Sequence, residues 1–167
     1  ANSVKRARAK RPRRNREPSR ALRLTIQNAT RSSTIPATRH FRKWIRAALR
    51  AGGSITVRLV GVREGRELNR TYRGKDYATN VLTFVLHDTA PFEGDVALCV
   101  PVVTREARAQ RKALSAHYAH LTVHAVLHLQ GYQHDEQGDA TRMEKLEKRI
   151  MKRLGYPNPY ATQLNHG

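Results

Sequence analysis

Cysteine and long hydrophobic runs are the features that this sequence most clearly lacks. A single cysteine, Cys99, cannot form a disulfide within the chain, so a disulfide-stapled fold is excluded. Cys99 lies in the apolar run Val96–Val100 and is predicted to be a buried core thiol. No segment is apolar over the roughly 20 residues that a membrane-spanning helix needs, and none resembles a secretory signal peptide. These absences fit a reducing compartment and predict a cytoplasmic protein without a membrane partner.

Acidic residues are also scarce. The 167 residues include 32 Lys and Arg but only 13 Asp and Glu, for a net charge of +19. Residues 1–20 contain nine of these basic residues and one acid, Glu17. Subtracting them leaves 23 basic and 12 acidic residues in 21–167, a net charge of +11, which is more than solubility requires. We therefore expect a polyanionic partner, and nucleic acid fits best.

The hydrophobic patterning predicts one α+β domain. Alternating or continuous apolar residues predict strands at 22–26, 55–60, 81–86 and 95–100, with a loop at 88–94 and Pro101 ending the last strand. Helical spacing predicts helices near 36–51, 64–72, 103–111, 115–130 and 139–154. The expected fold class is α+β, with a small four-stranded sheet packed with about five helices. The domain is expected over 22–160, between a disordered basic arm at 1–21 and a C-terminal tail at 161–167.

Three histidines form the most informative motif. His124, His128 and His134 are spaced H-x-x-x-H-x-x-G-x-x-H, with the glycine at Gly131. In the helix predicted over 115–130, His124 and His128 share one face, because residues four apart lie one turn above each other. Gly131 can end this helix and let the chain bring His134 back over the helix end. Three neutral imidazoles then leave one position open on a tetrahedral zinc ion, as in catalytic zinc sites.

The same motif lacks a residue that zinc peptidases need. The residue after the first histidine is Ala125, where a peptidase carries its glutamate base. A zinc peptidase or amidase is therefore the weaker alternative. His117 and His120 lie on nearly the same helix face, and we expect them to contact backbone, substrate or solvent. If His120 were instead a fourth zinc ligand, an RNA-binding factor with a mainly structural zinc would be favoured.

A second cluster of polar residues lies between the predicted helix 64–72 and the strand 81–86. Arg73 and Lys75 flank Gly74, and Asn80 directly precedes the strand. Such a turn can offer cations and backbone N–H groups to a phosphate, so Lys75 and Asn80 are candidate phosphate contacts. An ordinary surface turn with scattered charge would look the same, so the pattern alone does not decide between the two.

Three segments together resemble the YbeY family of bacterial endoribonucleases. They are residues 68–84 (LNRTYRGKDYATNVLTF), 93–96 (EGDV) and 124–134 (HAVLHLQGYQH). The resemblance covers residues 22–160, and the basic arm lies outside the family pattern. The sequence departs from the family pattern at Ala78 and Val85, where proline is usual. Neither change removes a reactive group.

The resemblance implies a site and an activity. It implies a single α+β domain related in shape to zinc peptidases, with a small mixed sheet, a metalloprotease-like zinc helix, one zinc ion bound by the three motif histidines and a functionally important arginine at Arg73. The implied activity is metal-dependent cleavage of single-stranded RNA in small-subunit rRNA maturation and ribosome quality control, with rRNA and the small ribosomal subunit as partners.

The residues then suggest a chemical hypothesis. Arg73 would bind the scissile phosphate and stabilise the charge that grows in the transition state. Zinc would polarise a phosphoryl oxygen or lower the pKa of a water molecule. The general base remains unassigned among metal-activated water, the substrate 2′-hydroxyl and Asp135.

Overall fold

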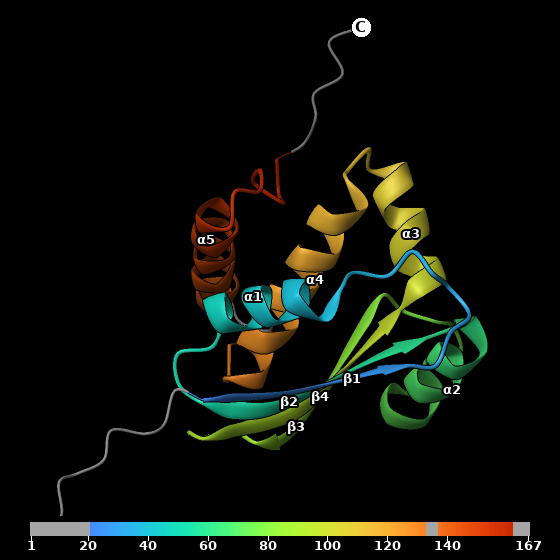
Figure 1. Cartoon of the computed structure of the whole chain (residues 1–167), viewed down its shortest axis with the longest axis horizontal. Coiled ribbons are helices and arrows are strands. Elements are labelled where there is room, and N and C mark those ends of the chain that lie inside the picture. The colour runs from blue at the N-terminus through green and yellow to red at the C-terminus, as the bar shows by residue number, and fades with distance from the viewer. Residues whose placement is uncertain (1–20, 133–136, 162–167) are drawn as a thin grey trace, which may run out of the picture.

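The structure, a computed structural model, describes residues 21–132 and 137–161 (Figure 1). Residues 1–20 of the arm predicted at 1–21, residues 162–167 of the tail, and both His134 and Asp135 lie outside the described residues. The described elements in chain order are β1 (Leu22–Asn28), α1 (Thr38–Ala48), β2 (Gly53–Val60), α2 (Val62–Arg73), β3 (Val81–His87), β4 (Phe92–Cys99), α3 (Val100–Ala109), α4 (Leu114–Leu129) and α5 (Gln137–Arg153). Every predicted strand and helix has its counterpart, and the α+β prediction is confirmed.

The four strands form one mixed sheet in the order β1-β2-β4-β3. β1 pairs with β2 and β2 with β4 in parallel, whereas β3 pairs antiparallel with β4 and forms one edge. The register aligns Ile26, Val57, Val96 and Thr83 in a row across the sheet. Because side chains alternate between faces along a strand, this row marks the face that the helices cover.

Helices α1, α4 and α5 lie on one side of the sheet (Figure 1). Phe41 and Trp44 of α1 are buried and meet edge to face, and Phe41 also contacts Tyr118 of α4. The prediction that α4 is buried on most sides is confirmed, since 11 of its 16 residues are buried. A Cβ atom at Gly94 would lie 2.2 Å from Cδ1 of Leu129, so the glycine allows α4 to approach the sheet closely.

The opposite face of the sheet is partly covered by α2. Leu68 of this helix packs against Val60 and Cys99, where β2 and β4 end. The Cys99 side chain is 1 % exposed, which confirms the predicted core thiol, and burial raises the pKa of this thiol. None of the described helices is both long and apolar enough to cross a membrane.

Two sequence predictions about β4 and α3 are wrong. Phe92–Gly94 belongs to the loop predicted at 88–94, but in the structure it is the start of β4, with Phe92 buried and paired with Gly53. Pro101 lies in the first turn of α3, which begins at Val100, and does not separate the strand from the helix. Proline suits a first helical turn because its fixed φ matches the helix and its missing N–H would have no intrahelical partner there.

Candidate functional site

The two described histidines of the motif meet at one point beside α4. His124 and His128 lie one turn apart, and their Nε2 atoms are 3.0 Å from each other. A tetrahedral zinc ion with bonds of about 2.0–2.1 Å holds its ligand atoms roughly 3.3 Å apart. The observed separation is close to this value, so the two nitrogens fit as neighbouring ligands of one ion. Gly131, with φ +97°, follows the end of α4 as predicted.

A buried carboxylate from α5 supports His124. Glu147 is 0 % exposed, and its Oε1 lies 3.1 Å from Nδ1 of His124. Its Oε2 accepts hydrogen bonds from Nε2 of His120 at 2.5 Å and from the Tyr160 hydroxyl at 2.7 Å. Burial by itself would raise the pKa of Glu147, but the hydrogen bonds from the histidines and the tyrosine outweigh burial and lower this pKa to about 2.

The contact with Glu147 determines which nitrogen of His124 can bind a metal. An ionised carboxylate can only accept hydrogen bonds, so Nδ1 of His124 carries a hydrogen and donates a hydrogen bond to Glu147. Nε2 is then unprotonated and directed at His128, as in the carboxylate–histidine pairs that support bound metals. Sequence reasoning missed Glu147, although a signal was present: it lies on the buried stripe of α5 between Met143 and Ile150, where an acid needs a partner.

His120, His124 and Glu147 also form a group that could hold a metal ion, with ligand atoms within 4.8 Å of one another. In this group, however, Nε2 of His120 and Oε2 of Glu147 are 2.5 Å apart, well below the roughly 3.3 Å between ligands of one tetrahedral zinc ion. The two atoms instead make a short hydrogen bond from the imidazole N–H to the carboxylate. The geometry therefore favours Glu147 as a support of the histidines and His124 with His128 as the ligands.

The expectation for His117 and His120 was wrong, because both contact carboxylates. Nε2 of His117 lies 3.1 Å from Oε1 of Glu106, and burial lowers the pKa of this histidine. Nδ2 of Asn80 donates to the same Oε1 at 3.0 Å. The Asn80 amide is thus engaged within the protein, with Glu106 through Nδ2 and with the Val81 N–H through Oδ1.

A groove of about 1170 Å³ is lined in part by His124 and His128 and follows the edge strand β3. Its lining residues are Gln27, Thr56, Arg58, Glu64, Leu68, Tyr72, Arg73, Val81, Leu82, Thr83, Phe84, Val85, Leu86, Asp95, Val96, Ala97, His124 and His128. The structure therefore brings Arg73 to the same groove as His124 and His128. Lys75 and Asn80 are not among the lining residues and stay predictions as phosphate contacts.

The position of Arg73 is set by the end of α2. Gly74 adopts φ +68°, which few other residues tolerate, and its N–H closes the helix on Arg70 and Asn69. The buried Asn69 side chain then donates to the Tyr77 carbonyl at 2.7 Å and holds the following turn. The backbone of Arg73 is consequently held at the rim of the groove, and its side chain is exposed.

The acidic residues near Arg73 pair with other arginines, so the Arg73 guanidinium is available to an anion. Asp76 accepts hydrogen bonds from Nε and Nη2 of Arg66, each at 2.8 Å, and the hydrogen bond from Arg66 lowers the pKa of Asp76. Glu64 pairs with Arg58 at 2.7 Å. No described carboxylate forms an ion pair with Arg73. Arg73 is thus a cation at the groove without a competing partner among the described acids.

Comparisons with known proteins identify a family. The family model described as Endoribonuclease YbeY matches residues 25–155. The chain is 55 % identical over 140 residues to a protein of Nitrosomonas eutropha named Endoribonuclease YbeY, covering 84 % of this chain and 99 % of that protein. It is also 55 % identical over 143 residues to the protein of that name from Aromatoleum aromaticum, covering 84 % and 93 %.

A solved structure shares the fold. The solution structure of TM1509 from Thermotoga maritima is similar with a TM-score of 0.53 and 22 % identity, covering 83 % of this chain and 99 % of that chain. At this identity the likeness bears on the fold alone. The family match and the curated relatives carry the assignment: the chain belongs to the Endoribonuclease YbeY family, and this membership supports a hydrolase that acts on RNA.

Proposed function

We propose that this chain is a metal-dependent endoribonuclease that cleaves single-stranded RNA in small-subunit rRNA maturation and ribosome quality control, in the cytoplasm. The observation that carries the proposal is the shared groove, in which two histidine nitrogens 3.0 Å apart are accompanied by Arg73. The net charge of +19 adds sequence-independent attraction for a polyanion.

The proposed cofactor is one zinc ion per chain, with His124, His128 and His134 as its ligands. All-imidazole donors suit zinc, and the supported Nε2 of His124 meets the requirement for an unprotonated ligand atom. When bound, the ion supplies Lewis-acid chemistry, which polarises phosphoryl oxygens and activates water. Glu147 keeps the proton on Nδ1 of His124 and so holds Nε2 in the ligating form.

The groove also offers features for a single strand. Arg73 is proposed to bind the scissile phosphate with its planar guanidinium and to stabilise the charge of the transition state. Next to it, Tyr72 is 65 % exposed and contacts the Phe84 ring edge to face, with centroids 4.9 Å apart. Exposed aromatic rings can stack on unpaired bases regardless of sequence, which favours single-stranded over duplex RNA.

A zinc peptidase is the second candidate. One observation favours it: the edge strand β3 runs along the groove, and an extended peptide can pair with such an edge. However, Ala125 is fully buried and supplies no base. The alternative of a structural zinc with His120 as fourth ligand is disfavoured, because Nε2 of His120 is bound to Glu147. Metal-dependent cleavage of casein without cleavage of RNA would establish the peptidase.

Arg73→Ala tests the proposed function. We expect kcat for cleavage of single-stranded RNA to fall roughly 100-fold, the effect of removing one charge-stabilising donor, while the bound metal is retained. Arg70→Ala is the matched control, because Arg70 is an exposed arginine of the same helix that does not line the groove. Equal rates for the two variants would contradict the role assigned to Arg73.

A further inference from the structure

The positive charge of the domain is concentrated in its N-terminal part. Residues 18–63 contain ten Lys and Arg but no Asp or Glu. Within 21–63 the net charge is +9, whereas residues 64–167 contain 14 basic and 12 acidic residues and add only +2. Most of the +11 of residues 21–167 therefore belongs to β1, α1, β2 and their connections, and not to the α2–β3 segment that carries Arg73.

Within this part, the cations gather on one side of α1. Arg39, Lys43 and Arg46 of α1 follow one another at i, i+4 and i+7 and are exposed, Arg42 lies beside them, and the exposed Arg50 follows just after the end of the helix. We call these five residues the α1 basic face. The opposite side of the helix is buried through Phe41, Trp44, Ile45 and Ala48, so the rotation of the helix about its axis is fixed and the cations are held outward.

No described acid neutralises the α1 basic face. None of its five cations forms an ion pair with a described carboxylate, whereas Arg58 and Arg66 elsewhere are paired with Glu64 and Asp76. Like charges four residues apart destabilise a helix by about 0.2–0.5 kcal/mol per pair, and α1 contains such pairs without an acid to offset them. Solubility alone favours mixed charges spread over the surface, so this arrangement points to an anionic partner.

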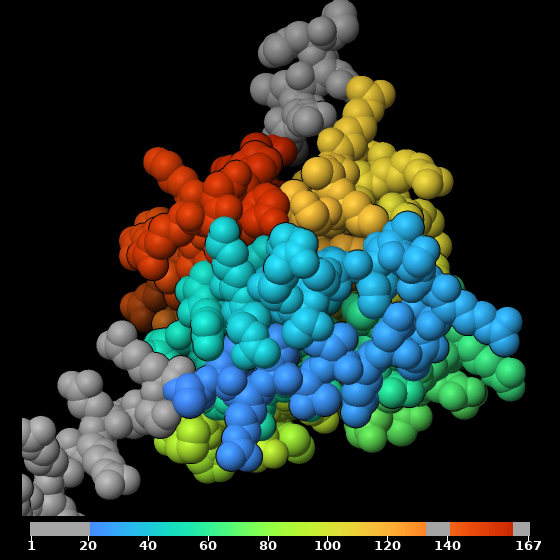
Figure 2. Space-filling view, viewed as in Figure 1, coloured from blue at the N-terminus to red at the C-terminus, as the bar shows by residue number. Residues whose placement is uncertain are grey.

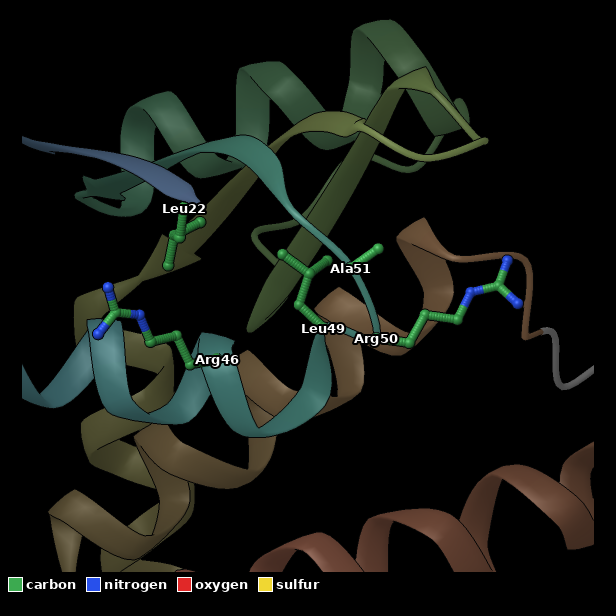
Figure 3. Close-up of a pocket in the computed structure, with 5 residues that line it drawn as sticks. All are labelled: Leu22, Arg46, Leu49, Arg50 and Ala51. Carbon is green, nitrogen blue, oxygen red and sulfur yellow. The ribbon is translucent and has the colours of Figure 1, made fainter. Parts of the chain in front are cut away.

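A hollow at the C-terminal end of α1 extends this surface. It measures about 410 Å³ and is lined by Leu22, Leu49, Ala51, Arg46 and Arg50. Arg46 reaches from α1 toward Leu22, while Arg50 extends away in the opposite direction (Figure 3). The guanidinium of Arg50 lies 5.3 Å from the centre of the Phe92 ring. The apolar floor beside Arg46 suits a ribose with a neighbouring phosphate.

The α1 basic face is separate from the groove. Helix α1 contacts β1 and α4 on the helix-covered face, whereas the groove follows β3 at the other end of the sheet and continues over the opposite face. On that opposite face the groove extends as far as Gln27 of β1, so the sheet itself lies between the groove and α1. Figure 2 shows α1 and β1 together at the front surface of the molecule. A short RNA in the groove therefore does not reach this face, but a longer one can.

We propose that the α1 basic face is a second RNA-binding surface, which holds the phosphate backbone of RNA that flanks the segment in the groove. It supplies affinity without sequence preference and takes no part in the chemistry. The proposal rests on RNA being the substrate class of the groove, but it is tested by binding alone.

The test compares RNAs of two lengths with a charge-reversed variant of the full chain. Single-stranded RNAs of about 6 and about 30 nucleotides, bracketing the usual site sizes of single-strand grooves, are bound in the presence of a chelator so that they are not cleaved. Arg39→Glu, Lys43→Glu and Arg46→Glu are combined in one variant. The matched control reverses Arg142, Lys145 and Arg149, which are exposed on α5 and give the same change in charge.

We expect the α1 variant to bind the longer RNA 10- to 100-fold more weakly at about 0.1 M salt, with a slope of log K against log salt smaller by about 2. Binding of the short RNA and its rate of cleavage by metal-loaded protein should match the wild type, and melting curves should overlay. Unchanged binding of the longer RNA, or an equal loss in the α5 control, would overturn the proposal. Absence of cleavage by the wild type would count against the proposed nuclease, and the binding result would still decide on the second surface.

Discussion

His128→Ala is expected to lower the rate of RNA cleavage by about 1,000-fold or more. Nε2 of His128 lies 3.0 Å from Nε2 of His124, so removal of the His128 side chain removes one ligand of the proposed ion. Lewis-acid stabilisation of a transition state contributes several kcal/mol, and each 1.36 kcal/mol corresponds to a factor of ten in rate. The measurement is single-turnover cleavage of a labelled single-stranded RNA, with metal content determined on the same sample.

The control for this variant is His40→Ala, which removes an exposed histidine of α1. His128 is itself partly exposed, so its truncation should leave the thermal midpoint within a few degrees, consistent with the small stability changes typical of surface positions. Cleavage by the folded His128→Ala protein at the wild-type rate would mean that the histidine pair is not the reactive site.

Glu147→Ala is expected to weaken metal binding 10- to 100-fold, the usual effect of removing the carboxylate behind a ligating histidine. It should also lower the free energy of unfolding by about 3 kcal/mol, because three hydrogen-bond donors lose their acceptor in a buried position. Those donors are His120, His124 and the Tyr160 hydroxyl. Competition with a metal-binding dye measures the affinity, and urea unfolding of the metal-free protein measures the stability.

Two further variants distinguish the loss of support for His124 from a general disruption of α5. Glu144→Ala changes a neighbouring, partly exposed acid on the same helix and should alter neither quantity. Glu147→Gln keeps the volume and an acceptor oxygen but loses the charge, so its metal affinity should lie between the wild type and Glu147→Ala. If Glu147→Ala lowers stability but keeps the wild-type metal affinity, Glu147 is structural and does not position His124.

The order of elements was predictable because it depends on local patterns. Alternation in β1 and the apolar residues of α4 are properties of short segments, and burial confirms both. The error at Phe92–Gly94 has a tertiary cause: the missing Cβ of Gly94 makes room for Leu129 of α4, 35 positions further along the chain. Contacts of this kind leave no trace in a short sequence window.

The site was predictable in part. The spacing of His124 and His128 on one helix determines their common face, and the structure has them side by side. The position of Arg73 in the same groove as these histidines depends on the pairing of β3 with β4 and on the packing of α2. The spacing of residues in the sequence does not encode these contacts, and only the family resemblance pointed to a shared site. Glu147 contacts His124 although the two residues are 23 positions apart in the sequence. His134 lies outside the described residues, so its part in metal binding stays a prediction.

The most direct test of the central claim is to restore zinc to metal-stripped protein while following RNA cleavage and bound metal together. The account predicts that stripped protein does not cleave single-stranded RNA, and that activity rises with added zinc until one ion per chain is bound. Arg73→Ala should bind the same amount of zinc but remain slow. Full cleavage by the stripped protein in the presence of a chelator would contradict the account, as would a zinc-loaded protein that cleaves casein and leaves RNA intact.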